Sequence, residues 1–295
     1  MKHEFIEANT LEDAWFLTLY RVIDEGRVHT INRGSYAGQK RLEFDYVTIQ
    51  IKNPGKGDLI PRIPESYNIE NPVADGYCEK YSQKYLMGHE LAKNESYTYG
   101  QRITRYPVDH PIELYKDETQ KEIIIQEIDT LLALGIIEKS YKEVYADRMK
   151  IDEETKEVVR YAKKMEVPKY FVNQIELINW LYNTKGHRNN QTVLQIAHPT
   201  DLLLQDPPCL RHIQVRIQDG KLHFFVYFRS WDLWNGFPAN LGGIQILKQY
   251  MSEMIGVEDG EIFATSGGLH IYDYVFDRGK VLRMRDEIEL KIGKN

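Results

Sequence analysis

The sequence predicts an α/β or α+β fold in which a mixed β-sheet is flanked by helices. Three observations support this prediction. Segments with the two-residue alternation of a strand are interspersed with segments that repeat apolar residues at helical spacing. The chain has 295 residues and is 42% hydrophobic, which is enough for a large core in one domain or a closely joined pair. No internal repeat or low-complexity tract interrupts this mixture.

The N-terminal region is expected to contain a helix and a strand. Thr10 supplies a capping hydroxyl, and the apolar residues after it repeat at helical spacing until Gly26. Residues 42–51 alternate as a strand, and the phase of the alternation changes at Tyr46, which predicts a β-bulge. Further helices are expected at 77–87, 118–134 and 170–183, and further strands at 192–197 and 261–265.

The clearest local signal is a β-hairpin followed by a helix. The Asp-Gly pair at 219–220 separates two alternating segments, 213–218 and 222–228, and this pair favours a tight hairpin turn. Pro238 then opens a helix that Gly256 ends.

Residues 138–168 differ from these elements because their charges alternate without a clear apolar face. We therefore expect a single domain over residues 1–295 with an exposed insertion at about 138–168.

Composition narrows the classes of function. The net charge is −6, and no basic cluster of the kind that binds nucleic acid is present, so we expect no nucleic-acid substrate. The only two cysteines, Cys78 and Cys209, are far apart, which favours a reducing compartment. No apolar signal run opens the chain, and no stretch approaches the roughly 20 apolar residues of a membrane span. We expect a cytoplasmic protein without a membrane partner.

One cysteine lies in a distinctive setting. Cys209 follows Pro207-Pro208, and the hairpin separates it from an Arg-Ser-x-Asp segment that begins at Arg229. A lone cysteine is usually a small buried hydrophobe. A nearby cation, however, lowers the pKa of a thiol and makes it a nucleophile, and the hairpin can bring Arg229 close to Cys209. We therefore expect Arg229 to lower the pKa of the Cys209 thiol.

These motifs resemble the active-site block of the thymidylate synthase family, and the pattern is most similar to its divergent archaeal branch. The resemblance implies a thymidylate synthase-like fold and a homodimer that forms through the sheet. It also implies a methyltransferase without a metal. In that reaction Cys209 adds to dUMP, and C5 then takes a one-carbon unit from 5,10-methylenetetrahydrofolate or a related pterin carrier to give dTMP.

The resemblance also assigns the nucleotide-binding residues. Arg229 and Ser230 match positions that contact the phosphate. Asn240, in Pro-x-Asn at the start of a helix, matches the asparagine that reads the pyrimidine, and its carboxamide offers both a donor and an acceptor. His270 and Tyr272 match the pair that binds the sugar 3′-hydroxyl, and residues at i and i+2 of an extended segment share one face.

The remaining assignments concern the cofactor and the protons. Asp232 and Gly236 match positions that bind the folate, where the acid pairs with the pterin and the glycine leaves room for it. Tyr99, in Tyr-Gly-Gln-Arg, resembles the tyrosine that helps to remove the C5 proton through water. Glu79 is our choice for the glutamate that activates the cofactor.

Two arginines are assigned to the phosphate from outside this block. Arg33 lies in a polar loop that matches the family's mobile phosphate loop. Arg188 is the residue that would reach the phosphate from the partner subunit.

Two alternatives stay open. A dUMP or dCMP hydroxymethylase shares the fold and the first steps, and Asn240 favours uracil without deciding between the two reactions. A catalytically inactive nucleotide- or RNA-binding relative is disfavoured, because Cys209, Arg229 and Asn240 are all present.

Overall fold

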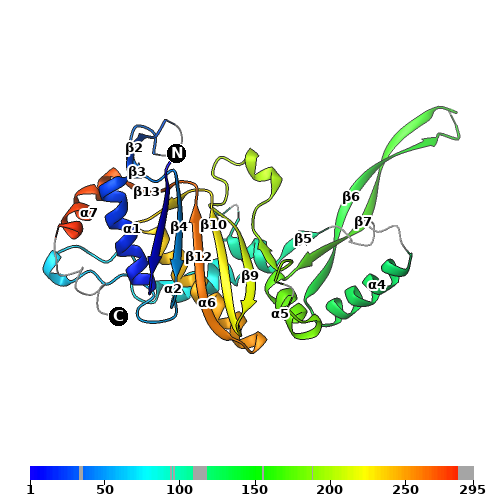
Figure 1. The fold of residues 1–295 in the computed structure, drawn as a ribbon. Helices are drawn as coiled ribbons and strands as arrows, with labels where there is room; N and C mark the ends of the chain where they lie inside the picture. The colour runs from blue at the N-terminus through cyan, green and yellow to red at the C-terminus, as the bar shows by residue number, and fades with distance from the viewer. Residues whose placement is uncertain are drawn as a thin grey trace. The chain divides into compact units, whose positions relative to one another are not determined.

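The computed structural model describes residues 1–32, 36–93, 95, 97–108, 118–154, 156–187 and 189–284. The chain forms two compact units, of which the larger combines Met1–Thr104 with Ile178–Asn295 and the smaller is Arg105–Leu177 (Figure 1). The mixture of sheets and flanking helices agrees with the predicted fold class. No helix within the described ranges is long and apolar enough to cross a membrane.

A six-stranded mixed sheet forms the centre of the larger unit. Its strands, in spatial order, are β1 (His3–Ala8), β4 (Tyr46–Ile51), β12 (Glu258–Ser266), β10 (Lys221–Phe228), β9 (Leu210–Gln218) and β8 (Val193–Gln195). The pairs β1–β4 and β10–β12 are parallel, and the other neighbours are antiparallel. Apolar side chains alternate along these strands, so that one face of the sheet is buried.

Two long helices accompany this sheet (Figure 1). Helix α1 (Leu11–Glu25) begins at Thr10, which forms the expected cap together with Asp13. Helix α6 (Gly236–Ile255) ends at Gly256, whose φ of 81° is the left-handed conformation that glycine favours at this place. Both predicted helices are therefore confirmed. Shorter helical segments in this unit are α2 (Tyr77–Tyr81), the π-helical turn Ser82–Leu86, α3 (Tyr99–Thr104) and α7 (Phe276–Arg283).

The predicted hairpin is also confirmed. Asp219 and Gly220 both have positive φ, 51° and 74°, as a type I′ turn requires. Gln218 therefore pairs with Lys221, and β9 and β10 are antiparallel neighbours along their length. This geometry returns the chain from Cys209, just before β9, to Arg229, just after β10.

A second sheet corrects one prediction. Its four strands, in spatial order, are β11 (Trp231–Asp232), β13 (Leu269–Tyr272), β3 (Lys40–Glu43) and β2 (Arg27–Thr30). The segment 42–51 is not one bulged strand, because the chain leaves this sheet after Glu43 and enters the large sheet at Tyr46. Phe44 at the crossing is buried, and the Asp45 carboxylate accepts a hydrogen bond from Arg27. The change in the phase of the alternation at Tyr46 therefore marks the place where the chain passes from the smaller sheet to the larger one.

The smaller unit contains helix α4 (Glu118–Ala133) and a three-stranded sheet. Its strands, in spatial order, are β5 (Tyr106–Val108), β7 (Val158–Val172) and β6 (Ile137–Ile151). The charged segment at 138–168 is thus two long antiparallel strands. Helix α5 (Gln174–Lys185) begins later than predicted, because Tyr170 and Val172 are buried as part of β7.

Candidate active site

A pocket of about 540 Å³ lies in the larger unit, where the ends of both sheets meet. Six of the residues expected from the sequence line it: Cys209, Arg229, Ser230, Asp232, His270 and Tyr272. The other lining residues are Ile31, Tyr36, Arg41, Gln205, Asp206 and Trp231. The structure therefore brings together residues from three strands, β3, β11 and β13, and from the turns next to the strands of both sheets.

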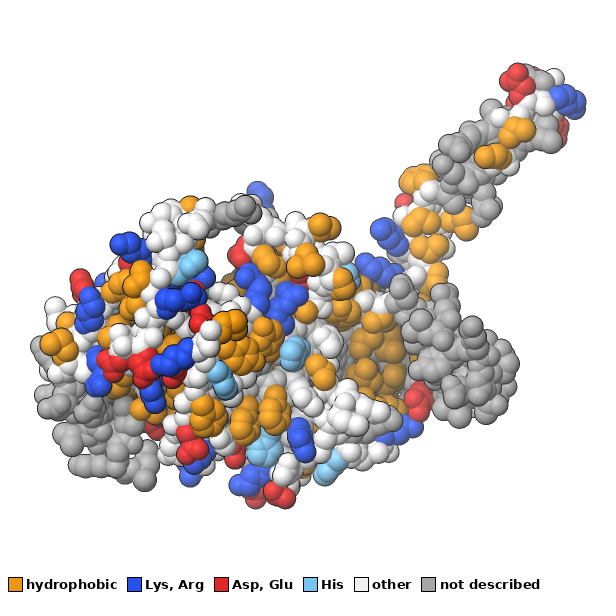
Figure 2. Space-filling view, turned by 45° about the horizontal axis from the view of Figure 1, so that its top comes forward, with side chains coloured by type: hydrophobic (Ala, Val, Ile, Leu, Met, Phe, Trp, Pro, Cys, Tyr) orange, Lys and Arg blue, Asp and Glu red, His pale blue; other side chains and the backbone are white. Residues whose placement is uncertain are grey.

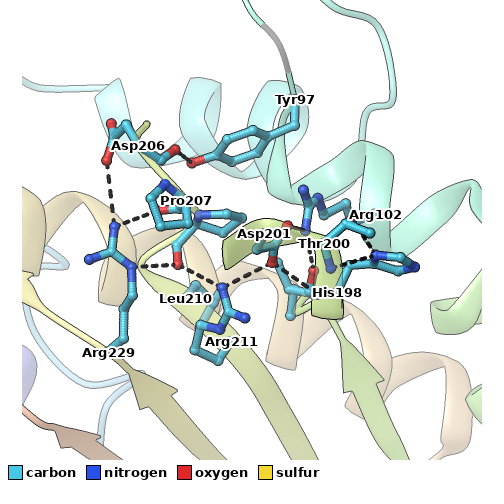
Figure 3. A network of polar contacts seen from close by, with 12 residues as sticks. Tyr97, Arg102, His198, Thr200, Asp201, Asp206, Pro207, Leu210, Arg211 and Arg229 are labelled. Carbon is cyan, nitrogen blue, oxygen red and sulfur yellow. Dashed lines mark hydrogen bonds and ion pairs between the residues drawn. The ribbon is translucent and has the colours of Figure 1, made fainter. Parts of the chain in front are cut away.

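Arg229 holds the turn that carries the cysteine (Figure 3). Its backbone N–H donates to the Cys209 carbonyl at 2.9 Å. Its Nε donates to the Pro208 carbonyl at 3.1 Å, and a terminal nitrogen donates to the Pro207 carbonyl and faces the Asp206 carboxylate at 3.5 Å. The guanidinium thus fixes the Pro-Pro turn from beneath.

Behind this turn, a buried carboxylate joins two further arginines (Figure 3). Asp201 is only 1% exposed, and its oxygens lie 2.7 Å from Arg102 and 3.0 Å from Arg211. Arg211 also donates to the Pro208 carbonyl at 3.2 Å. Arg211 and Arg229 therefore converge on one carbonyl next to Cys209. The sequence interpretation missed Asp201 and Arg211, because neither belongs to a local motif.

The expected lowering of the Cys209 pKa is wrong for this structure. Burial raises the pKa of the thiol and outweighs Arg229 and Arg211, which both lower it, while Asp206 raises it further. The cations are present as predicted, but the desolvation of the thiol is a larger effect. The protein instead holds Cys209 as a thiol whose ionised form has two cations close by.

Asn240, near the start of α6, is held on two sides. Its Oδ1 accepts from the Trp231 indole nitrogen at 3.0 Å, and its Nδ2 donates to the Tyr81 hydroxyl at 2.7 Å. Tyr81 was missed because it is far from Asn240 in the sequence. Glu79, our choice for the catalytic glutamate, is exposed and does not line the pocket. Residues two apart on a helix face different directions, so Tyr81 and Glu79 cannot both point at Asn240.

Tyr99, at the start of α3, lies beside the turn that carries Cys209. Its hydroxyl accepts from the Leu210 backbone N–H at 3.4 Å. The pKa of Tyr99 is raised by burial and by the neighbouring Cys209, so its hydroxyl keeps its proton at neutral pH.

His270 presents an unused acceptor at the pocket. Its Nδ1 lies 2.9 Å from the Gly268 carbonyl, which only accepts, so Nδ1 carries the proton. Burial lowers the pKa of His270 to about 4, and the ring is therefore neutral. Its Nε2 is buried and has no hydrogen-bond partner among the described residues. A hydroxyl group is the natural donor to such a nitrogen.

Tyr272, two residues further on, adds a donor to this side of the pocket. Burial raises the pKa of Tyr272 to about 12, so its hydroxyl is protonated. Its ring stacks on Tyr36 at 4.7 Å between centroids and meets the His270 ring edge-on at 4.9 Å. The two residues of the His-x-Tyr motif therefore offer one acceptor and one donor together.

Asp232 and Gly236 shape the turn into α6. The carboxylate accepts the backbone N–H groups of Trp234 at 3.0 Å, Asn235 at 3.3 Å and Gly236 at 3.3 Å. A Cβ atom on Gly236 would lie 3.4 Å from the Asp232 Cβ and 3.6 Å from the Asn240 Oδ1. A methyl group at this position would therefore be in ordinary contact with both polar side chains.

Arg33 and Arg188 lie outside the described residues. The pocket gains another cation instead from Arg41 on β3, which pairs in register with Tyr272 of β13. Its Nε lies 2.6 Å from Glu43. Among the residues described, no group of three or more His, Cys, Asp or Glu side chains could hold a metal ion.

This set of groups places cations, hydrogen-bond donors and an unused acceptor around one thiol. A sequence model described as "Thymidylate synthase" matches residues 139–292. A protein of Methanosarcina acetivorans named "Putative thymidylate synthase" is 27% identical over 274 residues, or 92% of this chain and 91% of the relative. Relatives of the same name from Methanosarcina mazei and Methanothermobacter thermautotrophicus are 25% and 23% identical, again over 92% of this chain. The chain belongs to the thymidylate synthase family, as the motifs indicated.

Proposed function

We propose that the protein is a thymidylate synthase, which transfers a one-carbon unit from 5,10-methylenetetrahydrofolate or a related pterin to C5 of dUMP and gives dTMP. The observation that carries this proposal is the single pocket that joins the Cys209 thiol to the unpaired His270 acceptor and to the cations Arg229 and Arg41. These groups suit the base, sugar and phosphate of one nucleotide. Because both cysteines are unpaired, we place the activity in the cytoplasm.

The covalent step depends on Cys209 and Asn240. The Sγ atom adds to C6 of uracil, and the electron pair of the C5=C6 bond moves onto C5 and O4 as an enolate. Arg229 and Arg211 stabilise the thiolate before addition, because both lower the thiol pKa. A donor at the Asn240 amide stabilises the charge that develops on O4. The enolate makes C5 a carbon nucleophile.

Removal of the C5 proton and release of the enzyme complete the sequence. Tyr99 lies beside Cys209, and its protonated hydroxyl can position a water that accepts the C5 proton. The bond from Sγ to C6 then breaks, and Cys209 returns as the thiolate.

The nucleotide is oriented by the rest of the pocket. His270 accepts from the sugar 3′-hydroxyl through Nε2, and Tyr272 donates to the same hydroxyl. Arg229, Ser230 and Arg41 contact the phosphate, with Arg33 and Arg188 as further candidates. These contacts would hold C6 next to Sγ. The addition of the thiolate then becomes an effectively unimolecular step.

The folate has a matching site beside the nucleotide. A flat ring that carries hydrogen-bond donors would pair with the Asp232 carboxylate, and Gly236 presents no side chain at this place. When bound, the folate supplies the one-carbon unit and the hydride that reduces it to a methyl group. Asp232 would hold the pterin, and Gly236 would let it approach the pyrimidine.

A homodimer is part of the proposal. The face of the large sheet opposite its buried side carries stacked aromatic rings, with Phe225 and Phe263 at 4.9 Å and His212 and Tyr227 at 5.6 Å. Phe5 on the edge strand β1 is 53% exposed. Figure 2 shows hydrophobic side chains and histidines gathered on the larger unit. Such a patch supports association through the sheet, with Arg188 donated to the partner's site.

The oligomer is tested by sedimentation velocity. The wild type should sediment as a dimer, and Phe263→Arg should give a monomer because it places a charge in the aromatic patch. Val28→Arg, at an exposed position of β2, is the matched control and should remain dimeric. An active wild-type monomer would refute this part of the proposal.

The reaction is tested by weighing its product. The protein is incubated with dUMP and methylenetetrahydrofolate, and the nucleotide is identified by mass spectrometry. Formation of dTMP is the expected result. Hydroxymethyl-dUMP would replace the proposed function with that of a hydroxymethylase. With 5-fluoro-dUMP and the folate, an adduct should appear on the peptide that contains Cys209.

A further inference from the structure

The indole of Trp231 is held rigidly beside Asn240. Its ring lies between Phe228 and Phe237, with centroid distances of 4.2 Å and 4.6 Å and interplanar angles of 9° and 23°. Trp231 is 2% exposed, so the ring has no space to rotate. Its Nε1 therefore presents one N–H in a fixed direction, toward the Asn240 Oδ1 at 3.0 Å.

This contact decides which way the Asn240 amide faces. An indole nitrogen is a donor only, so the amide atom that meets it has to be the oxygen. A flipped amide would place two donors against each other in a buried site, which is costly. The Tyr81 hydroxyl, 2.7 Å from Nδ2, can donate or accept and therefore follows the orientation that Trp231 sets.

The oriented amide has a nucleophile side and a far side. Nδ2 donates to Tyr81, whose pKa is raised by burial and further by the neighbouring Tyr99 and Cys209. Tyr99 in turn accepts from the backbone N–H of the residue after Cys209. The donor end of the amide thus lies toward the thiol, and the acceptor end lies toward the aromatic stack.

We infer that Trp231 determines base specificity, because it fixes Asn240 in the orientation that accepts uracil and rejects cytosine. The inference rests on the proposed function, in which C6 lies at Sγ. The 4-substituent of a pyrimidine lies on the side of its reactive C5–C6 bond, whereas N3 lies opposite C6. Nδ2 then meets the 4-substituent and Oδ1 meets N3. Uracil offers an acceptor at O4 and a donor at N3, so both pairs match. Cytosine reverses both groups, so both pairs fail.

The test compares two tryptophans that are three residues apart. Trp231→Phe keeps the stacked ring and removes only the N–H. Trp234→Phe makes the same change in a buried ring that packs on Trp15 and is the matched control. Dissociation constants for dUMP and dCMP are measured by titration calorimetry for each protein. We expect the preference for dUMP to fall roughly five- to tenfold in Trp231→Phe, the effect of one hydrogen bond, and to stay unchanged in Trp234→Phe.

The outcomes separate this inference from the proposed function. A folded Trp231→Phe protein that keeps the wild-type preference overturns the inference alone. A wild type that binds neither nucleotide overturns both. If Trp231→Phe does not fold, a measurement on the wild type tests the same inference. With dUMP bound, the Asn240 side-chain protons should show strong nuclear Overhauser contacts to the Tyr81 ring. Contacts to the Trp231 indole proton that are stronger than those to Tyr81 would mean a flipped amide and would overturn the inference.

Discussion

The two cysteines occupy contrasting environments. Cys78 is 2% exposed and packs against the helix, with its Sγ 3.7 Å from the Pro238 carbonyl. Cys209 lines the pocket and has Arg229 and Arg211 nearby. Burial raises the pKa of both thiols, to about 11 for Cys78. Only Cys209 has cations that oppose this effect, so charge and access to the pocket, rather than burial, distinguish the environments of the two thiols.

The largest expected effect is the loss of the nucleophile. Cys209→Ser should lower dTMP formation at least about a thousandfold while nucleotide binding persists, because a hydroxyl is scarcely ionised near neutral pH. Cys78→Ser, the matched control, should leave the chemical step nearly unchanged. Single-turnover rates and dissociation constants for dUMP measure both effects. Substantial turnover by Cys209→Ser would contradict the covalent mechanism.

The packing role of Cys78 predicts a smaller effect on stability. A Cβ atom on Gly242 of α6 would lie only 2.4 Å from the Cys78 Sγ. Gly242→Ala should therefore destabilise the protein by about 1–3 kcal/mol, as overpacking does. Adding Cys78→Ala should recover part of that loss, because it removes the sulfur atom that the new methyl group would overlap. Denaturant unfolding of the two single variants and the double variant measures the coupling, and strict additivity would show that the two sites do not touch.

The raised pKa of Cys78 predicts a pH dependence of stability. The folded pKa of about 11 lies above the ordinary value of 9.0. The folded state therefore holds the proton longer, and the stabilisation is fully present below pH 9. It is lost as the pH rises from 9 through 11, and it amounts to about 3 kcal/mol. Subtracting the unfolding free energies of Cys78→Ala from those of the wild type between pH 8 and 11 isolates this contribution. A difference that does not change with pH would mean that the thiol titrates normally.

The smallest effect concerns the cation next to the nucleophile. Arg211→Gln should raise the Cys209 pKa and slow its alkylation by iodoacetamide roughly fivefold near neutral pH, and the rate should recover at higher pH. Arg211→Lys should restore most of the wild-type profile. Arg216→Gln, on an exposed part of the same strand, is the control. An unchanged pH profile in Arg211→Gln would leave Arg211 a purely structural role.

Local patterns predicted the part of the site that is continuous in sequence. The Asp-Gly turn and Pro238 were sufficient to predict the order of strands and helix around Cys209, because turn chemistry is local. The contact between Asn240 and Tyr81 was not predictable. Tyr81 reaches Asn240 only after distant segments pack, and the sequence does not encode that contact as a spacing.

The burial of Cys209 and the sheet to which each part of 42–51 belongs could not be predicted from the sequence either. The thiol pKa of Cys209 depends on how much water is excluded, and a motif does not state this. The alternation at 42–51 was recognised as strand, but its passage from one sheet to another is a tertiary event. The charged segment at 138–168 pairs with itself as β6 and β7, and a chain with charges on both faces gives little periodic sign of such pairing.

The Pro-Pro turn has a consequence for interpreting related sequences. Proline has no N–H, so Pro207 and Pro208 offer neighbouring elements only oxygen atoms. The carbonyl groups of this turn take their hydrogen bonds from long side chains, namely the guanidinium groups of Arg229 and Arg211. The positive charge at the thiol is therefore also an architectural requirement of the turn. A related protein without this cysteine would still use both arginines to hold the turn. The presence of both arginines in such a protein would therefore indicate a shared fold, not catalysis.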